Sequence, residues 1–154
     1  MDANTFIEHY FEQQRARTAQ MPFKLAAILD AARTMGLIEI HIAYDGMGDE
    51  GNIDEISGFK PSNRDAQVDL AGAIPCDPVD LTAPQIITVG DRTYQALNDL
   101  IEDYGWDIIN TQHGGFEIND GGFGEILITV ATGKVKLDMS NRFMSHDTTE
   151  VEVA

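Results

Sequence analysis

Two glycine-rich loops carry the residue types in this chain that could bind a ligand or a metal ion. The first runs from Tyr44 to Glu55 and contains the spacing G-x-G-x-x-G directly after an alternating strand pattern. In dinucleotide-binding proteins this spacing works because a helix follows the glycines, so that free backbone N–H groups meet the pyrophosphate. Here the residues after Gly51 favour a strand, and Asp49 and Glu50 would repel a phosphate. The pattern therefore argues against nucleotide binding.

Carboxylates of the two loops could instead hold a hard cation. An EF-hand starting at Asp45 would need an oxygen ligand at its third position and glycine at its sixth, where the chain has Met47 and Glu50. The EF-hand pattern fails, whereas a cation site shared by both loops stays open if the loops lie side by side. Its ligands would be Asp49, Asn119, Asp120 and Glu125. The alternative is that the glycines and Asn119-Asp120 only form tight hairpin turns, with the carboxylates in water.

Nucleophilic catalysis and zinc binding have little support in the sequence. Cys76 is the single cysteine and precedes Asp77, whose charge opposes thiolate formation. The four histidines show no zinc-ligand spacing. We therefore expect no catalytic residue and no cofactor, and an enzyme only if the cation site exists.

The compartment follows from the same cysteine count. A single cysteine cannot form an internal disulfide, which favours a reducing cytoplasm. The first 20 residues lack the basic and apolar segments of a signal peptide, and no apolar run reaches the length of a membrane span. We expect a cytoplasmic protein that does not contact membranes.

Two helices are predicted ahead of the loops. Residues 3–18 place Phe6, Ile7, Tyr10 and Phe11 on one helical face. Pro22 suits the first turn of a second helix, and Gly36 suits a left-handed C-terminal cap. Residues 1–36 are therefore predicted to form a helical hairpin.

A sheet is predicted to follow, because the hydrophobic period changes from 3.6 to 2 at Leu37. Residues 37–59 predict a β-hairpin whose return strand is bulged. Residues 60–90 contain four prolines and predict an irregular connection with a short strand over 67–70. A third helix is expected over 91–105, capped by Asp91 and ended by Gly105, and a β-meander over 116–153. The whole, 1–154, is expected to be one α+β domain with its helices packed on one face of an antiparallel sheet.

The net charge is placed unevenly along the chain. The sequence has 26 acidic and 10 basic residues, which gives a formal charge of −16. The first 37 residues contain four of each, so the remaining 22 acids and six bases carry the entire excess. So few cations exclude phosphate-driven binding of nucleic acid. The acidic part is either a solvated surface or the docking surface of a cationic partner.

At the two loops the sequence resembles a family of small bacterial, plasmid and phage proteins classed as a domain of unknown function. The first motif is Tyr-x-Gly-x-Gly-Asp-x-Gly, from Tyr44 to Gly51. The second is Glu-Ile-Asn-Asp-Gly with a following Gly-Glu, from Glu117 to Glu125, and Asn141-Arg142-Phe143 follows it. The resemblance implies no reaction. It implies that the loops belong to one structural unit, and its setting among phages and mobile elements suggests a role against host defence.

The function expected from the sequence is non-enzymatic protein binding. An acidic surface would compete with phosphates for lysine and arginine, for example in the nucleic-acid channel of a host defence complex. The oligomeric state is left open. The residues predicted to bind the basic partner are Asp45, Asp49, Glu50, Asp54, Glu55, Asp99, Glu102 and Asp103. The competing hypothesis is a metal-dependent enzyme or cation-binding module at the two loops.

Overall fold

The structure, a computed structural model, describes residues 3–47, 50–61, 76–113, 121–141 and 147–153. Within these residues six strands form one antiparallel sheet in the order β3-β2-β1-β6-β7-β8, and β4 and β5 form a separate two-stranded ribbon. The element order is α1 (Ala3–Thr34), β1 (Glu39–Met47), β2 (Glu50–Pro61), β3 (Cys76–Val79), β4 (Ile87–Val89), β5 (Arg92–Tyr94), α2 (Leu97–Gln112), β6 (Gly122–Thr129), β7 (Lys134–Asn141) and β8 (Asp147–Glu152).

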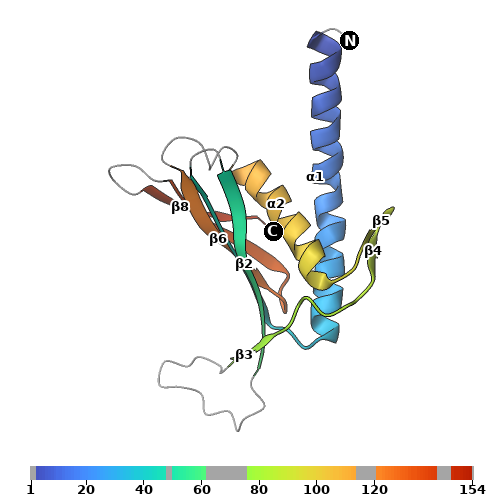
Figure 1. The fold of residues 1–154 in the computed structure, drawn as a ribbon, viewed down its shortest axis with the longest axis vertical. Helices are drawn as coiled ribbons and strands as arrows, with labels where there is room; N and C mark the ends of the chain where they lie inside the picture. Colours follow the sequence, from blue (N-terminus) through green and yellow to red (C-terminus); the bar gives the residue numbers. More distant parts are fainter. Residues whose placement is uncertain (1–2, 48–49, 62–75, 114–120, 142–146, 154) are drawn as a thin grey trace.

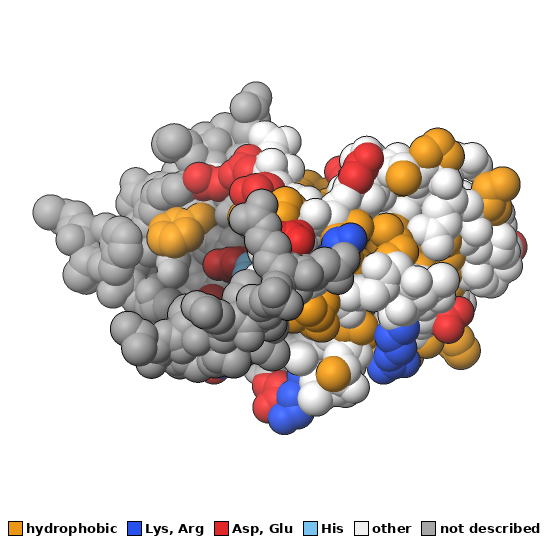
Figure 2. Space-filling view, turned by 90° about the horizontal axis from the view of Figure 1, so that it is seen from below, with side chains coloured by type: hydrophobic (Ala, Val, Ile, Leu, Met, Phe, Trp, Pro, Cys, Tyr) orange, Lys and Arg blue, Asp and Glu red, His pale blue; other side chains and the backbone are white. Residues whose placement is uncertain are grey.

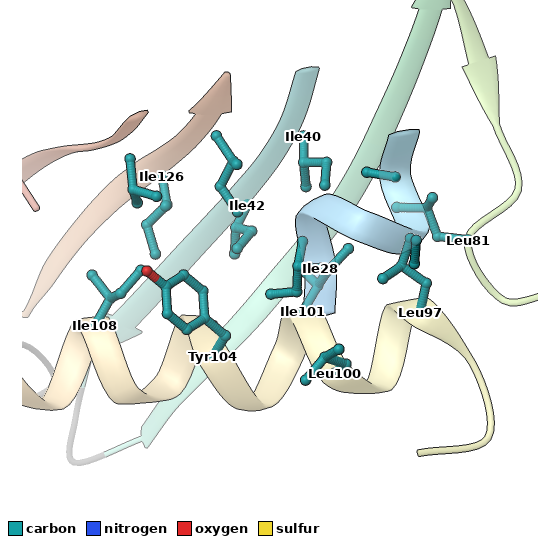
Figure 3. Packing of buried hydrophobic residues seen from close by; sticks show 14 of the residues in the cluster. Ile28, Ile40, Ile42, Leu81, Leu97, Leu100, Ile101, Tyr104, Ile108 and Ile126 are labelled. Atoms are coloured by element: carbon teal, nitrogen blue, oxygen red, sulfur yellow. The ribbon is translucent and has the colours of Figure 1, made fainter. Parts of the chain in front are cut away.

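One face of the sheet is covered by α2 and by the C-terminal half of α1 (Figure 1). Alternate residues of β1 point into this layer, since Ile40, Ile42 and Tyr44 are at most 2% exposed. Burying one such side chain contributes about 1.5–3 kcal/mol. The close view in Figure 3 shows strand residues facing a row on α2, with Ile28 of α1 among them; that row is Leu97, Leu100, Ile101, Tyr104 and Ile108. The α+β class and the antiparallel sheet are thus confirmed.

The N-terminal helices differ from the prediction, because α1 is one helix of 32 residues with Pro22 inside it. A proline in a helix lacks one N–H donor and costs about 3 kcal/mol, yet it does not require a turn. The residues before Pro22, from Thr18 to Met21, include no glycine or asparagine that would form one. The ring of Pro22 is exposed, and the turns after it are held by burial of Lys24 and Ile28. The predicted helical hairpin over 1–36 is wrong.

The helix predicted over 91–105 also has different bounds, since α2 runs from Leu97 to Gln112. It starts later because Arg92–Tyr94 pairs with β4 as a strand. It passes Gly105 because this glycine is buried where the helix meets the sheet: a Cβ there would lie 3.2 Å from Cδ1 of Ile53 and 3.4 Å from Cδ1 of Ile42. The glycine allows close packing and does not end the helix.

The other sheet predictions have mixed outcomes. The bulged hairpin is confirmed, because the β1–β2 register shifts between Ala43 and Tyr44, and Asp54 is the extra residue of β2. The left-handed cap at Gly36 is confirmed by its φ of 76°. The connection over 60–90 is wrong in part, since β3 and β4 lie within it. The strand predicted over 67–70 lies outside the described residues.

Candidate functional site

The face of the sheet opposite the two helices carries a row of carboxylates. In antiparallel strands, residues that pair directly place their side chains on the same face. Glu55 of β2 pairs with Ala43 of β1, which pairs with Glu125 of β6. Glu125 in turn pairs with Asp138 of β7, and Asp138 pairs with Glu150 of β8. We call these four carboxylates, Glu55, Glu125, Asp138 and Glu150, the acidic row. All four are exposed.

Strand spacing keeps members of the acidic row close together, since neighbouring strands lie about 5 Å apart. Desolvation, followed by the hydrogen bond and the negative charge of Glu150, raises the pKa of Asp138 above its ordinary value. The pKa of Glu150 is lowered, because the Nζ atom of Lys136 donates a hydrogen bond to its Oε1 at 2.7 Å. Asp138 and Glu150 therefore lie side by side on paired strands, and Lys136 pairs with Glu150.

His41 joins the acidic row to a further carboxylate on the same face. Its Nδ1 lies 3.0 Å from Oε1 of Glu125, and its Nε2 lies 3.1 Å from Oε2 of Glu39. The ring also meets the ring of Phe59 edge to face, with centroids 5.1 Å apart. A doubly protonated imidazole can donate to both carboxylates, whereas the neutral form can donate to only one.

The described ends of both glycine-rich loops lie at one end of the sheet. Gly46 of β1 pairs with Gly51 on one side and with Gly122 on the other. The strands that flank the two motifs are therefore neighbours, a point that the sequence left open. Figure 1 shows this end of the sheet beside the C-terminal end of α2.

A tyrosine of the first motif packs across a glycine of the second. A Cβ at Gly124 would lie 2.5 Å from the hydroxyl oxygen of Tyr44 and 2.6 Å from the backbone oxygen of Asp138. No side chain fits there. The Tyr44 hydroxyl forms a hydrogen bond with Nδ1 of His113, the residue just after α2, at 2.6 Å. Burial raises the pKa of Tyr44 well above its ordinary value. This buried pair ties the end of α2 to the sheet beneath the loops.

The partner-binding residues predicted in the first loop do not all lie on the same surface. Asp45 is half-buried on the same face as the acidic row, where it pairs with Asn52 and Phe123. Glu55 belongs to the row, and Asp54 is exposed at the bulge. Glu50 begins β2, and its backbone pairs with Met47. Asp49 lies outside the described residues.

The cation site predicted at the two loops falls mostly outside the described residues. Of its four ligands, Asp49, Asn119 and Asp120 lie outside the described residues, and Glu125 lies beside His41. The described part of the chain contains no group of three His, Cys, Asp or Glu residues arranged to hold a metal ion.

The acids predicted on the helix lie away from the acidic row, because α2 covers the opposite face of the sheet. Asp99 and Glu102 are exposed on α2. Asp103 is different, since its Oδ2 atom lies 3.2 Å from Nζ of Lys24 and 3.2 Å from Nη1 of Arg92. Tyr94 donates a further hydrogen bond to the same oxygen. Partial burial alone would raise the pKa of Asp103, but the hydrogen bonds from Tyr94 and Lys24 bring it below its usual range.

A buried ion pair between the helices was missed at the sequence level. Lys24 is 7% exposed, and its Nζ lies 2.5 Å from Oδ2 of Asp107, which is 3% exposed. Oδ1 of Asp107 accepts no hydrogen bond in the described structure, and Nε of Arg17 lies 3.8 Å from it. The sequence signal was spacing: Lys24 is four residues before buried Ile28, and Asp107 directly precedes buried Ile108.

Basic side chains form no continuous surface in the described part of the molecule that Figure 2 displays. They appear there as separate small patches among acidic, hydrophobic and neutral side chains. Three of the cations, Arg17, Lys24 and Arg92, lie within ion-pair distance of Asp103 or Asp107.

Fold and site together define an α+β domain whose antiparallel sheet is covered by helices on one face and carries carboxylates on the other. The chain belongs to a family of unknown function (DUF6878), whose model matches residues 20–153. This agrees with the resemblance drawn from the two loop motifs. No curated protein and no solved structure matches the chain. Neither of the two described helices is long and apolar enough to cross a membrane.

Proposed function

We propose that this protein is a protein-binding domain that presents the open face of its sheet to a basic surface of a partner. The observation that carries the proposal is the acidic row, in which carboxylates from four strands lie along one line across the sheet, with Ala43 of β1 between Glu55 and Glu125. Asp45 and Glu39 extend the negative surface along β1. A rigid sheet fixes the positions of these charges, so they can pair with several lysines or arginines at little entropic cost.

The electrostatics of the row support a binding role. The raised pKa of Asp138 reports that its charged form is disfavoured in the folded protein. Carboxylates held close together without enough cations lower stability, and a cationic partner would relieve their repulsion. A cationic group of a partner placed beside Asp138 would favour its charged form.

Apolar side chains on the same face support a protein partner. Phe59, Phe123 and Leu127 alternate with the polar residues of β2 and β6 and are each partly exposed. Protein interfaces combine such aromatic and aliphatic contacts with charged groups around them. A purely solvated face would carry polar residues at these positions.

The partner surface that fits this chemistry is one that otherwise binds phosphates. Carboxylates arranged on a fixed scaffold can occupy lysine and arginine side chains that would contact a nucleic-acid backbone. We propose the nucleic-acid channel of a host defence complex as the target, with the acidic row acting as a mimic of phosphate charge. The family's setting among mobile elements, inferred from the motifs, agrees with this target.

A charge-matched pair of variants tests the proposal. In the row variant, Glu55→Gln, Glu125→Gln, Asp138→Asn and Glu150→Gln are combined. In the control variant, four exposed acids elsewhere are neutralised in the same way: Glu12, Asp30, Asp80 and Asp91. Both variants carry four fewer negative charges than the wild type. Binding of each to a polylysine peptide and to a purified basic nucleic-acid-binding protein is measured by calorimetry at low and at physiological salt.

We expect the row variant to bind at least about tenfold more weakly than the control variant, which corresponds to about 1.4 kcal/mol. Binding of the wild type should weaken as salt rises and should be displaced by DNA. Equal loss in both variants would mean that only net charge attracts the probe, and the proposed face would be wrong. Absence of any binding by the wild type would refute the function itself.

The cation hypothesis at the loops remains a prediction with its own test. Thermal unfolding is measured with calcium, magnesium or manganese added in turn. A cation at about a hundred times its dissociation constant should add about 2.7 kcal/mol to the stability. An unchanged midpoint with all three cations would remove the hypothesis.

A further inference from the structure

The N-terminal half of α1 projects beyond the rest of the molecule, as Figure 1 shows. Its side chains include three large hydrophobic residues that are about half exposed: Ile7 at 48%, Tyr10 at 51% and Phe11 at 55%. A helical segment of this length is only marginally stable in water unless an apolar face is packed against something. Among the residues that the structure describes, nothing covers the projecting part of the helix as the core covers its C-terminal half.

The exposed residues continue the seam by which α1 packs on the body. Positions spaced alternately four and three residues apart lie along one stripe of a helix. Over the C-terminal half this stripe contains Met21, Leu25, Ile28 and Ala32, which are buried or half-buried in the core. Over the projecting half the same spacing gives Ile7, Phe11, Gln14 and Thr18. A single seam thus runs along α1, covered at one end and open at the other.

Two opposite charges border the open part of this seam on one side. Glu8, Phe11, Gln14, Arg15, Thr18 and Ala19 line one groove along the helix. Glu8 and Arg15 are seven residues apart, which places them at the same edge of the stripe. When two identical helices pair antiparallel about a two-fold axis, the same edge of each meets, so Glu8 of one lies beside Arg15 of the other. A parallel pair would put like residues at the same level along the axis.

We propose that a second copy of this chain covers the open seam, with the N-terminal halves of the two α1 helices packed antiparallel. Charge favours this occupant. The segment Asn4–Gln20 contains two acids, Glu8 and Glu12, and two bases, Arg15 and Arg17, so it is neutral in a chain of net charge −16. Two such chains repel each other over most of their surface. The projecting helix brings them together where neither carries net charge and keeps the acidic bodies apart.

The same charges select one register. With Phe11 of one helix beside Gln14 of the other, Ile7 lies beside Thr18, and Glu8 meets Arg15 twice, once on each side of the axis. A shift that centres the pair on Glu8 would bring the two Glu8 side chains together, and a shift toward Arg15 would bring the two arginines together. Opposite charges at paired edge positions stabilise helix pairs, and like charges destabilise them.

Charge exchange between two variants tests the proposal. Glu8→Arg places two arginines at the edge of every helix, and Arg15→Glu places two glutamates there. Glu12→Arg makes the same charge change as Glu8→Arg but lies outside the groove, so it is the matched control. Mass is measured by sedimentation equilibrium for each protein alone and for an equimolar mixture of the Glu8→Arg and Arg15→Glu variants. Circular dichroism and thermal unfolding confirm that each variant is folded.

The expected result is a concentration-dependent dimer for the wild type and for Glu12→Arg, and at least about tenfold weaker self-association for each of the other two variants. The mixture should recover the dimer, because each arginine pair then meets a glutamate pair. The combined variant E8R/R15E should dimerise alone, since its charges are exchanged but still opposite in an antiparallel pair. Cysteines placed at Phe11 and Gln14, in a Cys76→Ser background, should cross-link position 11 to 14 more than 11 to 11.

A wild type that stays monomeric at all concentrations would overturn the proposal. So would dimers that Glu8→Arg and Arg15→Glu leave unchanged, because the interface would then lie elsewhere. Preferred cross-linking of position 11 to 11 would refute the antiparallel register.

Discussion

Removing the charge of Lys24 should destabilise the fold far more than removing an exposed lysine. The Nζ atom of Lys24 lies between two carboxylates, 2.5 Å from Asp107 and 3.2 Å from Asp103. The Asp107 side chain is 2% exposed, so in Lys24→Met its charge would remain buried without this cation. Breaking a buried pair in this way costs about 3–5 kcal/mol. For a chain of this size that corresponds to a fall in Tm of about 10 °C or more.

The assay is urea unfolding followed by circular dichroism for the wild type and for four variants: Lys24→Met, Asp107→Leu, their combination and a control. Lys134→Met is the control, because Lys134 pairs with Glu152 at 3.9 Å with both side chains more than two thirds exposed. Such surface pairs contribute about 0–1 kcal/mol. The double variant K24M/D107L replaces the buried charges by apolar groups and should recover at least half of the loss, because no unpaired charge remains at position 107.

Two results would refute this reasoning. A loss of less than about 1 kcal/mol in Lys24→Met would mean that solvent reaches Asp107 and that burial does not govern the pair. A double variant less stable than the sum of the two single variants would mean that the side chains matter through their shape and not through their charge.

Three further predictions concern the sheet and α2. Gly124→Ala should lower stability by about 1–3 kcal/mol or more, because its Cβ would meet the Tyr44 hydroxyl and a backbone oxygen; unchanged urea unfolding would contradict this packing. Asp138→Asn should raise the Tm at neutral pH, because the folded-state pKa of Asp138 is raised and the wild type loses stability as the pH rises through it. The gain in Tm should vanish at acid pH. An equal gain at every pH would refute the electrostatic cause. The wild type should be more stable than Asp103→Asn above the unfolded pKa of about 4, because the folded-state pKa of Asp103 is lowered. This advantage should be lost as the pH falls through the lowered pKa. A wild-type advantage that persists unchanged to about pH 2 would show that Asp103 is not the titrating group.

How far the sequence predicted this fold depended on whether the signal was local. Alternation in Ile40–Tyr44 was enough for the first strand, and Gly36 for the left-handed cap, because neighbours along the chain determine both. Pro22 and Gly105 were misread, since a proline or glycine inside a helix is tolerated when tertiary packing holds the turns around it. Whether packing does so is a property of the folded core, which residue types alone do not report.

The sequence predicted that the site is acidic, but not how its side chains are arranged. That the sheet is acidic followed from the charge count, but the acidic row depends on the pairing of β1 with β6 and of β7 with β8. A shift of one residue in either pairing would move every side chain to the other face. Asp103 was predicted to bind a partner, but in the folded protein it pairs with Lys24 and Arg92, which other elements of the fold bring to it. No spacing pattern links residues that meet only through the fold.

The central place of β1 also determines when the sheet can form during synthesis. The hairpin of β1 and β2 is complete at Pro61, but the other edge of β1 is paired by β6, which ends at Thr129. Closing such a long loop is slow, because chain entropy opposes it until the distant contacts form. Between these two points in translation the nascent chain exposes an open strand edge and the apolar side of its first hairpin, so the ribosome-bound stage is when this protein is most exposed to aggregation and most dependent on chaperones.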